Sequence, residues 1–333
     1  MSCQRIAISF VQERHLNYDT RCHGLWIVVI YGNDGGELLR SSFRQIFIKT
    51  CRWKSKGVKV SDYGVILCTK MSTLKNSRLT GVLLDISGVL KDGGTVIAGS
   101  VEAVRKLREA GLKIRLVTNE TQVTRQTLTA SLTDLGFCVQ ERDIIPPCPA
   151  LITLLKRENM RPHLLVHPSV LPEFDGIDQN NPNCVVVSDA ADNFTYENLN
   201  KAFRTLIEME KPRLFSLGRG RYYSENGVLV LDVGVFTAAL EYAADIQAEV
   251  IGKPQPEFFM SALRDMRVEP QEAVMVGDDI VSDVGGAQHC GLTGVLVRTG
   301  KYRPSDEKHP TVHPDAIVND LAQAVDLILK SKQ

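Results

Sequence analysis

Four short groups of residues carry side chains suited to phosphoryl chemistry, and each follows or adjoins an apolar segment. In chain order they are Asp85-Ile86-Ser87-Gly88-Val89, Thr118-Asn119-Glu120, Gly252-Lys253-Pro254-Gln255-Pro256 and Gly277-Asp278-Asp279-Ile280-Val281-Ser282-Asp283. Any one of them also fits a turn or a helix cap. Because short motifs often match by chance, the interpretation depends on all four occurring together and in this order.

The combination indicates metal-assisted phosphoryl transfer. Asp85 and Asp278 would supply the hard oxygen ligands that Mg²⁺ prefers. A nearby lysine would neutralise a phosphoryl group and keep a nucleophilic carboxylate ionised, and a threonine hydroxyl with loop amides can bind phosphate oxygens. An aspartate nucleophile forms an aspartyl-phosphate and divides the transfer into two steps, while Mg²⁺ and the lysine stabilise the charge that develops.

The elements that must position these residues are alternating strands and helices. Apolar strands are expected at four places: 82–84, 114–117, 273–276 and 295–297. A helix with apolar residues at three-to-four spacing follows Ser100, its expected N-cap, and stops at Gly111. Strands that alternate with helices predict a Rossmann-like α/β fold whose parallel sheet is covered on both faces. Polar residues at the carboxyl ends of such strands meet at one edge, where ligands bind.

A second α/β domain is predicted between the second and third groups. Thr118 and Lys253 are 135 positions apart (253 − 118), far more than one crossover needs. The interval has apolar runs and a helical segment of its own, at 164–166, 184–187, 214–215, 228–231 and 196–209. The predicted organisation is therefore an N-terminal extension and a core interrupted by an inserted cap, with boundaries at 1–70, 71–146 (core), 147–249 (cap) and 250–333 (core).

The first 70 residues differ in composition from the rest. They contain 11 Lys and Arg against 5 Asp and Glu, a balance of +6, together with both tryptophans. They show no sustained helical or strand period, and Met71 reads as a natural start. We expect a poorly ordered extension; a basic arm that binds a partner is the alternative.

Composition also limits the partners and the location. Hydrophobic residues make up 44% and charged residues 23%, and 39 basic residues balance 39 acidic ones, which argues against nucleic acid or an anionic membrane as a partner. The longest apolar run, 25–31, is too short to span a bilayer, and the first residues do not resemble a signal peptide. The eight cysteines include no C-x-x-C pair, which leaves zinc binding without support and favours free thiols. A cytoplasmic location, with the nucleus in addition, is expected.

The four groups resemble the motifs of the haloacid dehalogenase superfamily of phosphatases, in the subclass with a large α/β cap. The resemblance covers about residues 79–333. It implies that Asp85 is the nucleophile, that Ser87 and Lys253 complete the catalytic set, and that Mg²⁺ is held by Asp85, the Ser87 carbonyl and Asp278. Asp279 and Asp283 would stand behind the metal. The implied substrate-binding residues are Asp85, Ile86, Ser87, Thr118, Asn119 and Lys253.

Ser87 departs from the superfamily pattern. Many members carry a second aspartate at this position, which protonates the leaving group; serine is a far poorer proton donor. General acid catalysis contributes about 10²- to 10⁴-fold, so a site without it should favour leaving groups that depart easily. Phosphoramidates (phosphohistidine, phospholysine, imidodiphosphate) and inorganic pyrophosphate fit that requirement. The substrate would be a phosphorylated small molecule or a phosphohistidine protein.

Two other functions remain open at this point. Ser87 is also compatible with a phosphate-binding scaffold that turns over poorly, and a receiver domain likewise phosphorylates an aspartate near Mg²⁺. The resemblance further implies a homodimer. The loop 91–95, which lies beside the active site in the family, looks shorter than its counterpart in similar proteins, so the substrate range depends on it.

Overall fold

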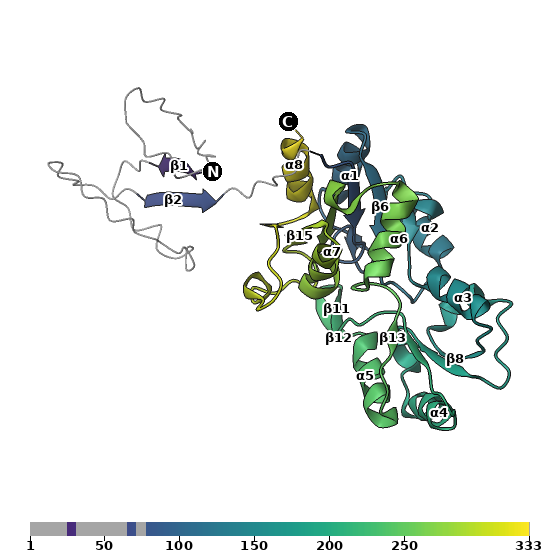
Figure 1. Cartoon of the computed structure of the whole chain (residues 1–333). Coiled ribbons are helices and arrows are strands. Elements are labelled where there is room, and N and C mark those ends of the chain that lie inside the picture. Colours follow the sequence, from purple (N-terminus) through teal and green to yellow (C-terminus); the bar gives the residue numbers. More distant parts are fainter. Residues whose placement is uncertain (1–24, 31–64, 71–77, 333) are drawn as a thin grey trace. The chain divides into compact units, whose positions relative to one another are not determined.

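The computed structural model describes residues 25–30, 65–70 and 78–332, in two units, Met1–Met71 and Ser72–Gln333 (Figure 1). In the first unit, β1 (Leu25–Ile30) pairs antiparallel with β2 (Val65–Lys70). Both strands coincide with short apolar pieces of the sequence. The rest of the segment 1–70, which we predicted to be poorly ordered, lies outside the described residues.

The second unit contains a sheet of six parallel strands in the order β16-β15-β14-β3-β6-β7. Its strands are β3 (Gly81–Leu84), β6 (Lys113–Val117), β7 (Ile144–Ile145), β14 (Ala273–Gly277), β15 (Thr293–Val297) and β16 (Ala316–Val318). From β3 the chain proceeds to β6 on one side and much later to β14 on the other. The strand order therefore reverses between β3 and β14, the place where ligands bind in such sheets.

Helices cover both faces of this sheet, as the apolar strands predicted. Val82 and Leu84 pack toward one set of helices, whereas Leu83 points to the opposite face. The first set is α1 (Ser100–Glu109), α2 (Arg125–Asp134) and α8 (Leu321–Ser331). The second is α6 (Pro256–Met266) and α7 (Gly286–His289). The predicted α/β fold with a parallel core sheet is confirmed.

The start of α1 differs from the prediction. Gly99, in a left-handed conformation, is the N-cap, and Ser100 is the first helical residue. The buried Ser100 hydroxyl instead donates to the Leu90 carbonyl oxygen at 2.9 Å, which ties the helix to the segment after β3. The predicted end is correct: Gly111 has φ +72° and its N–H donates to the Arg108 carbonyl oxygen.

The interval between β7 and α6 forms a second parallel sheet, in the order β13-β10-β9-β8. Its strands are β8 (Pro162–Leu165), β9 (Cys184–Val187), β10 (Leu214–Ser216) and β13 (Glu249–Val250). Helix α3 (Cys148–Arg157) packs on one face, and α4 (Tyr196–Ile207) and α5 (Val233–Ala244) on the other. We call this sheet with its helices the cap.

The apolar run 228–231 is not part of the cap sheet. It is β12 (Val228–Leu231), which forms a hairpin with β11 (Tyr222–Glu225). Val228 and Leu231 are more than half exposed. The hairpin contacts a smaller one, β4 (Lys91–Asp92) with β5 (Thr95–Val96), because Asp92 Oδ2 accepts hydrogen bonds from Ser224 Oγ at 3.3 Å and from the Gly227 N–H at 3.2 Å. The segment 91–95, which we expected to be a loop beside the active site, therefore forms hydrogen bonds with the β11–β12 hairpin.

Short helical turns complete the described elements. They are η2 (Glu141–Asp143), η3 (Pro168–Phe174), η4 (Ala191–Asn193), η5 (Pro270–Glu272), the π-helical η6 (Ile280–Gly285) and η7 (Asp306–Lys308). The four cysteines whose side chains are described are free thiols. Among the described helices, none combines the length and apolar character needed to cross a bilayer.

Glu241 of α5 anchors the loop that follows β10, and we expect Glu241→Gln to destabilise the cap. Its carboxylate binds Arg219 through two hydrogen bonds, at 2.6 and 2.9 Å, and accepts the Ala248 N–H at 2.8 Å. Burial raises the pKa of Glu241, but the hydrogen bonds from Arg219 and Ala248 lower it by a larger amount. The net shift of the pKa is therefore downward. The Glu241 carboxylate therefore stabilises the fold fully above the pKa of a glutamate in the unfolded chain, about 4.3. This stabilisation is lost as the pH falls from that value through the lower pKa of Glu241 in the folded protein.

The variant should lose about 1–2 kcal/mol of unfolding free energy at pH 7, and the difference from wild type should shrink near pH 3.5. Denaturant titrations at both pH values measure this. Glu210→Gln removes an exposed cap carboxylate and should leave stability unchanged. An unaltered Glu241→Gln protein at pH 7 would contradict the assignment.

Candidate active site

The carboxyl edge of the core sheet gathers the predicted residues into one pocket. Asp85 follows β3, Thr118 follows β6 and Asp278 follows β14, while Lys253 follows β13, where the chain returns from the cap. The pocket is lined by these four residues together with Ser87, Gly88, Asn119, Glu120, Thr121, Gln122, Asp189, Gly220, Tyr223, Ser224, Asp232, Asp279, Ser282, Asp283 and Lys301. Of the predicted substrate-binding residues, only Ile86 does not line it.

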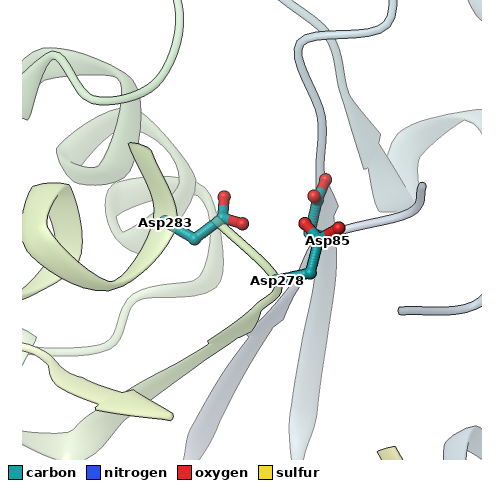
Figure 2. A group of neighbouring side chains, drawn as sticks. All are labelled: Asp85, Asp278 and Asp283. Carbon is teal, nitrogen blue, oxygen red and sulfur yellow. The ribbon is translucent and has the colours of Figure 1, made fainter. Parts of the chain in front are cut away.

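Three aspartates form the centre of the pocket. Asp85, Asp278 and Asp283 are buried, and each offers a carboxylate oxygen within 4.8 Å of the others (Figure 2). Asp283 comes from η6, which directly follows the Asp278 motif. Burial and the neighbouring negative charges raise the pKa of both Asp278 and Asp283. Such a cluster is stable only with compensating cations.

Lys253 supplies one of these cations. Its Nζ lies 2.7 Å from Asp85 Oδ1 and 2.7 Å from Asp283 Oδ1. Burial alone would lower the pKa of this lysine, but the two carboxylates outweigh burial and the net shift is upward. The Asp85 carboxylate also accepts the Ile86 N–H, at 2.8 Å and again through Oδ1. These contacts stabilise negative charge on Asp85.

The environment of Asp278 fits a metal ligand. Its Oδ2 accepts the Lys301 N–H at 2.8 Å, whereas its buried Oδ1 has no hydrogen-bond partner among the described residues. Leaving a buried carboxylate oxygen unpaired is costly unless a cation binds it. Asp283 Oδ1 also lacks a hydrogen-bond partner among the described residues, but it lies 2.7 Å from the Lys253 ammonium, and its Oδ2 accepts the Asp279 N–H at 3.1 Å. Asp85 and Asp278 are therefore the better candidates for metal ligands, whereas Asp283 pairs with the lysine.

Two glycines make room for the Asp278 carboxylate. Gly88 (φ +83°) and Gly300 (φ +62°) pass so close that a Cβ on either would lie 2.0 Å from Asp278 Oδ2. Both also have positive φ, a conformation that favours glycine. The loops after β3 and β15 thus enclose the carboxylate from two sides.

Lys301 lines the pocket, and the sequence analysis did not single it out. Its Nζ lies 3.1 Å from Asp279 Oδ2, and Asp279 Oδ1 caps η6 by accepting the Val281 and Ser282 N–H groups. Burial raises the pKa of Asp279, but Lys301 and these donors more than offset it and bring the pKa to about 2. Lys301 lies four positions beyond the end of β15 (301 − 297), so the strand-end rule that identified Asp85 and Asp278 did not select it.

Asn119 holds the backbone of Lys253. Its Nδ2 donates to the Lys253 carbonyl oxygen and its Oδ1 accepts the Lys253 N–H, both at 2.9 Å. Gly252 (φ +123°) permits this approach, since a Cβ there would lie 2.7 Å from Asn119 Oδ1. Because the side-chain amide of Asn119 is occupied, a contact from Asn119 to a phosphoryl group would come from its backbone N–H. Thr118 is buried, and its hydroxyl oxygen accepts the Glu120 N–H at 3.0 Å.

The cap closes the pocket with residues that the sequence did not single out. Asp189 follows β9, and its Oδ2 accepts from Gln122 Nε2 at 2.7 Å; the same nitrogen donates to the Tyr223 hydroxyl at 3.1 Å. Asp232 follows β12 and caps α5 through the Val233 N–H at 2.6 Å. Arg219, in the loop after β10, pairs with Glu241.

Two family profiles match the chain, one over the first part of the core and the start of the cap and the other over the second part of the core. A haloacid dehalogenase-like hydrolase profile covers residues 82–178, and a HAD-hydrolase-like profile covers residues 250–324. Together with the relatives below, these matches identify the class: the chain belongs to the haloacid dehalogenase-like hydrolases, as its motifs predicted.

Among individual proteins, the chain is similar to phospholysine phosphohistidine inorganic pyrophosphate phosphatase. The Xenopus laevis protein is 56% identical over 256 residues, which cover 75% of this chain and 95% of that one. The Homo sapiens protein is 57% identical over 254 residues, 75% and 94% of the two chains. The human haloacid dehalogenase-like hydrolase domain-containing protein 2 is 44% identical, with 76% and 96% coverage.

Solved structures agree on the fold. The 4-nitrophenylphosphatase of Thermotoga maritima superimposes with a TM-score of 0.68 at 25% identity, covering 75% of this chain and 97% of that one. NagD from E. coli gives 0.64 at 22% identity, covering 74% and 98%. The core sheet and cap are thus a shared architecture.

Gly300→Ala should weaken metal binding because its Cβ would displace the Asp278 carboxylate. We expect a loss of roughly 10- to 100-fold in Mg²⁺ affinity, the range for residues that orient metal ligands. Isothermal titration of Mg²⁺ into both proteins measures it.

Gly111→Ala is the matched control. Gly111 has a similar φ of +72°, but a Cβ at this position would meet no atom of the described residues within 4 Å. This variant therefore carries the backbone cost of about 1 kcal/mol and no steric conflict. If both variants bind Mg²⁺ equally well, the proposed contact with Asp278 is wrong.

Proposed function

We propose that the chain is a Mg²⁺-dependent phosphatase that hydrolyses P–N bonds (phosphohistidine, phospholysine, imidodiphosphate) and inorganic pyrophosphate through an aspartyl-phosphate. The observation that carries the proposal is the pocket itself: Asp85, paired with Lys253, faces the same space as the unpartnered oxygen of Asp278. The names of the relatives at 56–57% identity supply the substrate class.

In the first step, an Asp85 carboxylate oxygen attacks phosphorus, the P–N or P–O bond breaks, and the leaving group takes the bonding electrons. Asp85 uses Oδ1 for Lys253 and Ile86, and Oδ2 is therefore the oxygen assigned to the attack. Lys253 stabilises the carboxylate and, with Thr118 and the Asn119 N–H, binds phosphoryl oxygens. In the second step, water attacks phosphorus, and the bond to Asp85 breaks to release phosphate.

Mg²⁺ would be held by Asp85, the Ser87 carbonyl oxygen and Asp278, and it would neutralise charge on the phosphoryl oxygens. Asp283 and Asp279 keep the lysines and η6 in place behind these ligands. Glu120 lines the same pocket, and its carboxylate accepts the Gln122 N–H at 2.8 Å.

Ser87 is the residue that supports an alternative function. It lines the pocket without a carboxyl group to protonate a leaving group, so a protein that binds phosphate but turns over poorly is the second candidate. The homodimer and the cytoplasmic and nuclear location stay predictions from the family resemblance and composition.

Asp85→Asn should abolish turnover while leaving the fold intact, because asparagine has nearly the same shape but is a far weaker nucleophile. We expect a loss of roughly a thousandfold or more in phosphate release from N-phospholysine, imidodiphosphate and pyrophosphate. Release from p-nitrophenyl phosphate is measured in parallel, with and without Mg²⁺. If wild type binds Mg²⁺ and releases no phosphate from any of these compounds, the scaffold function replaces the enzyme.

Asp278→Asn should raise the Mg²⁺ concentration required for half-maximal activity by roughly tenfold or more, since even residues that only orient ligands contribute that much. The amide oxygen can still accept the Lys301 N–H, which preserves the loop. The measurement is activity against Mg²⁺ concentration, with thermal melting as the check on folding. An unchanged Mg²⁺ requirement would remove Asp278 from the ligand set.

A further inference from the structure

The pocket has acidic residues outside the aspartate triad and Asp279, and we call them the wall. They are Glu120 from the core and Asp189 and Asp232 from the cap. The two lysines that line the pocket, Lys253 and Lys301, both pair with carboxylates of the core. Among the described residues that line the pocket, no basic side chain comes from the cap. A leaving group beside this wall would therefore meet negative charge.

Two of these carboxylates are fixed in place. Asp232 caps α5 through Oδ1, while its Oδ2 lies over Gly220, where a Cβ would come within 1.8 Å. Asp189 binds the Ala191 N–H at 3.1 Å through Oδ1 and Gln122 through Oδ2, and its own N–H donates to Thr121 Oγ1 at 3.1 Å. Their charges are thus held at the pocket by backbone and side-chain contacts from both domains.

We propose that Asp189 and Asp232 are specificity-determining residues that favour a phosphoryl donor with a positively charged nitrogen next to phosphorus over an anionic donor. The proposal deepens the proposed function and rests on it. It follows from charge: Asp189 and Asp232 line the same pocket as Asp85, and we place the leaving group on their side once Asp85 and a metal hold the phosphoryl group. A protonated bridging nitrogen is attracted to them, whereas the second phosphate of pyrophosphate is repelled.

The same wall accounts for the absence of a carboxyl group at Ser87. A phosphoramidate that binds with its bridging nitrogen already protonated brings the proton with it. When the P–N bond breaks, the amine leaves with the bonding electrons and that proton, and Asp85 takes the phosphoryl group. The atoms balance without a proton from the protein, so the wall needs only to stabilise the charged form.

The test compares wild type with Asp189→Asn and Asp232→Asn, using N-phospholysine and pyrophosphate as substrates. Asparagine keeps the helix cap at position 232. We expect the ratio of kcat/KM for N-phospholysine to that for pyrophosphate to fall roughly 5- to 30-fold per substitution, the order expected for removing one unit charge from a partly buried pocket. The fall should come mainly from N-phospholysine, and added salt should reduce it.

Glu225→Gln is the matched control. Glu225 lies in β11, on the hairpin that precedes Asp232, and its side chain is exposed and does not line the pocket. This variant should keep the wild-type ratio. A parallel fall for both substrates in the wall variants, or an equal shift in Glu225→Gln, would overturn the proposal.

Binding in an Asp85→Asn background separates this proposal from the proposed function. Titration calorimetry of both compounds with Mg²⁺ needs no turnover. An inactive wild type would therefore contradict the proposed enzymatic function, while the effect of Asp189 and Asp232 on binding could still be measured. Selective weakening of N-phospholysine binding by the wall substitutions supports the proposal. Equal weakening of both compounds, or failure of both to bind in this background, contradicts it.

Discussion

The burial of carboxylates at one edge of a parallel sheet is the constraint on which the rest of the second unit depends. Asp85, Asp278 and Asp283 lie within 4.8 Å of one another and out of water, a grouping that repels itself unless cations join it. Lys253 is the cation in direct contact. Because this lysine follows the last cap strand, the cap must return the chain to this point.

The loops around the cluster are shaped by the same constraint. Asn119 grips the backbone of Lys253 from the neighbouring strand end, while Gly88 and Gly300 admit the Asp278 carboxylate where any side chain would collide. Each contact joins segments far apart in the sequence. The remaining unpaired oxygen of Asp278 is the part of this arrangement at which a cation would find a ligand.

The sequence was sufficient for residues whose position follows from a strand end. Asp85, Thr118 and Asp278 could be placed together because parallel strands align their carboxyl ends, whereas Lys301 lies four positions beyond the end of β15 (301 − 297) and the rule does not select it. Asp189 and Asp232 were beyond reach, since only the tertiary placement of the cap brings them to the pocket. Ser100 was misassigned because its hydroxyl bonds a carbonyl outside the helix.

The division of the pocket explains how one site can handle opposite charges. In the proposed function, the core half of the pocket, with its lysine, its loop amides and the candidate metal ligands, would bind the transferring phosphoryl group. The cap half presents carboxylates to whatever departs. A donor whose two ends carry opposite charges satisfies both halves, and a phosphoramidate protonated on nitrogen is such a donor. Pyrophosphate satisfies only the core half, so it can be turned over while gaining nothing from the cap.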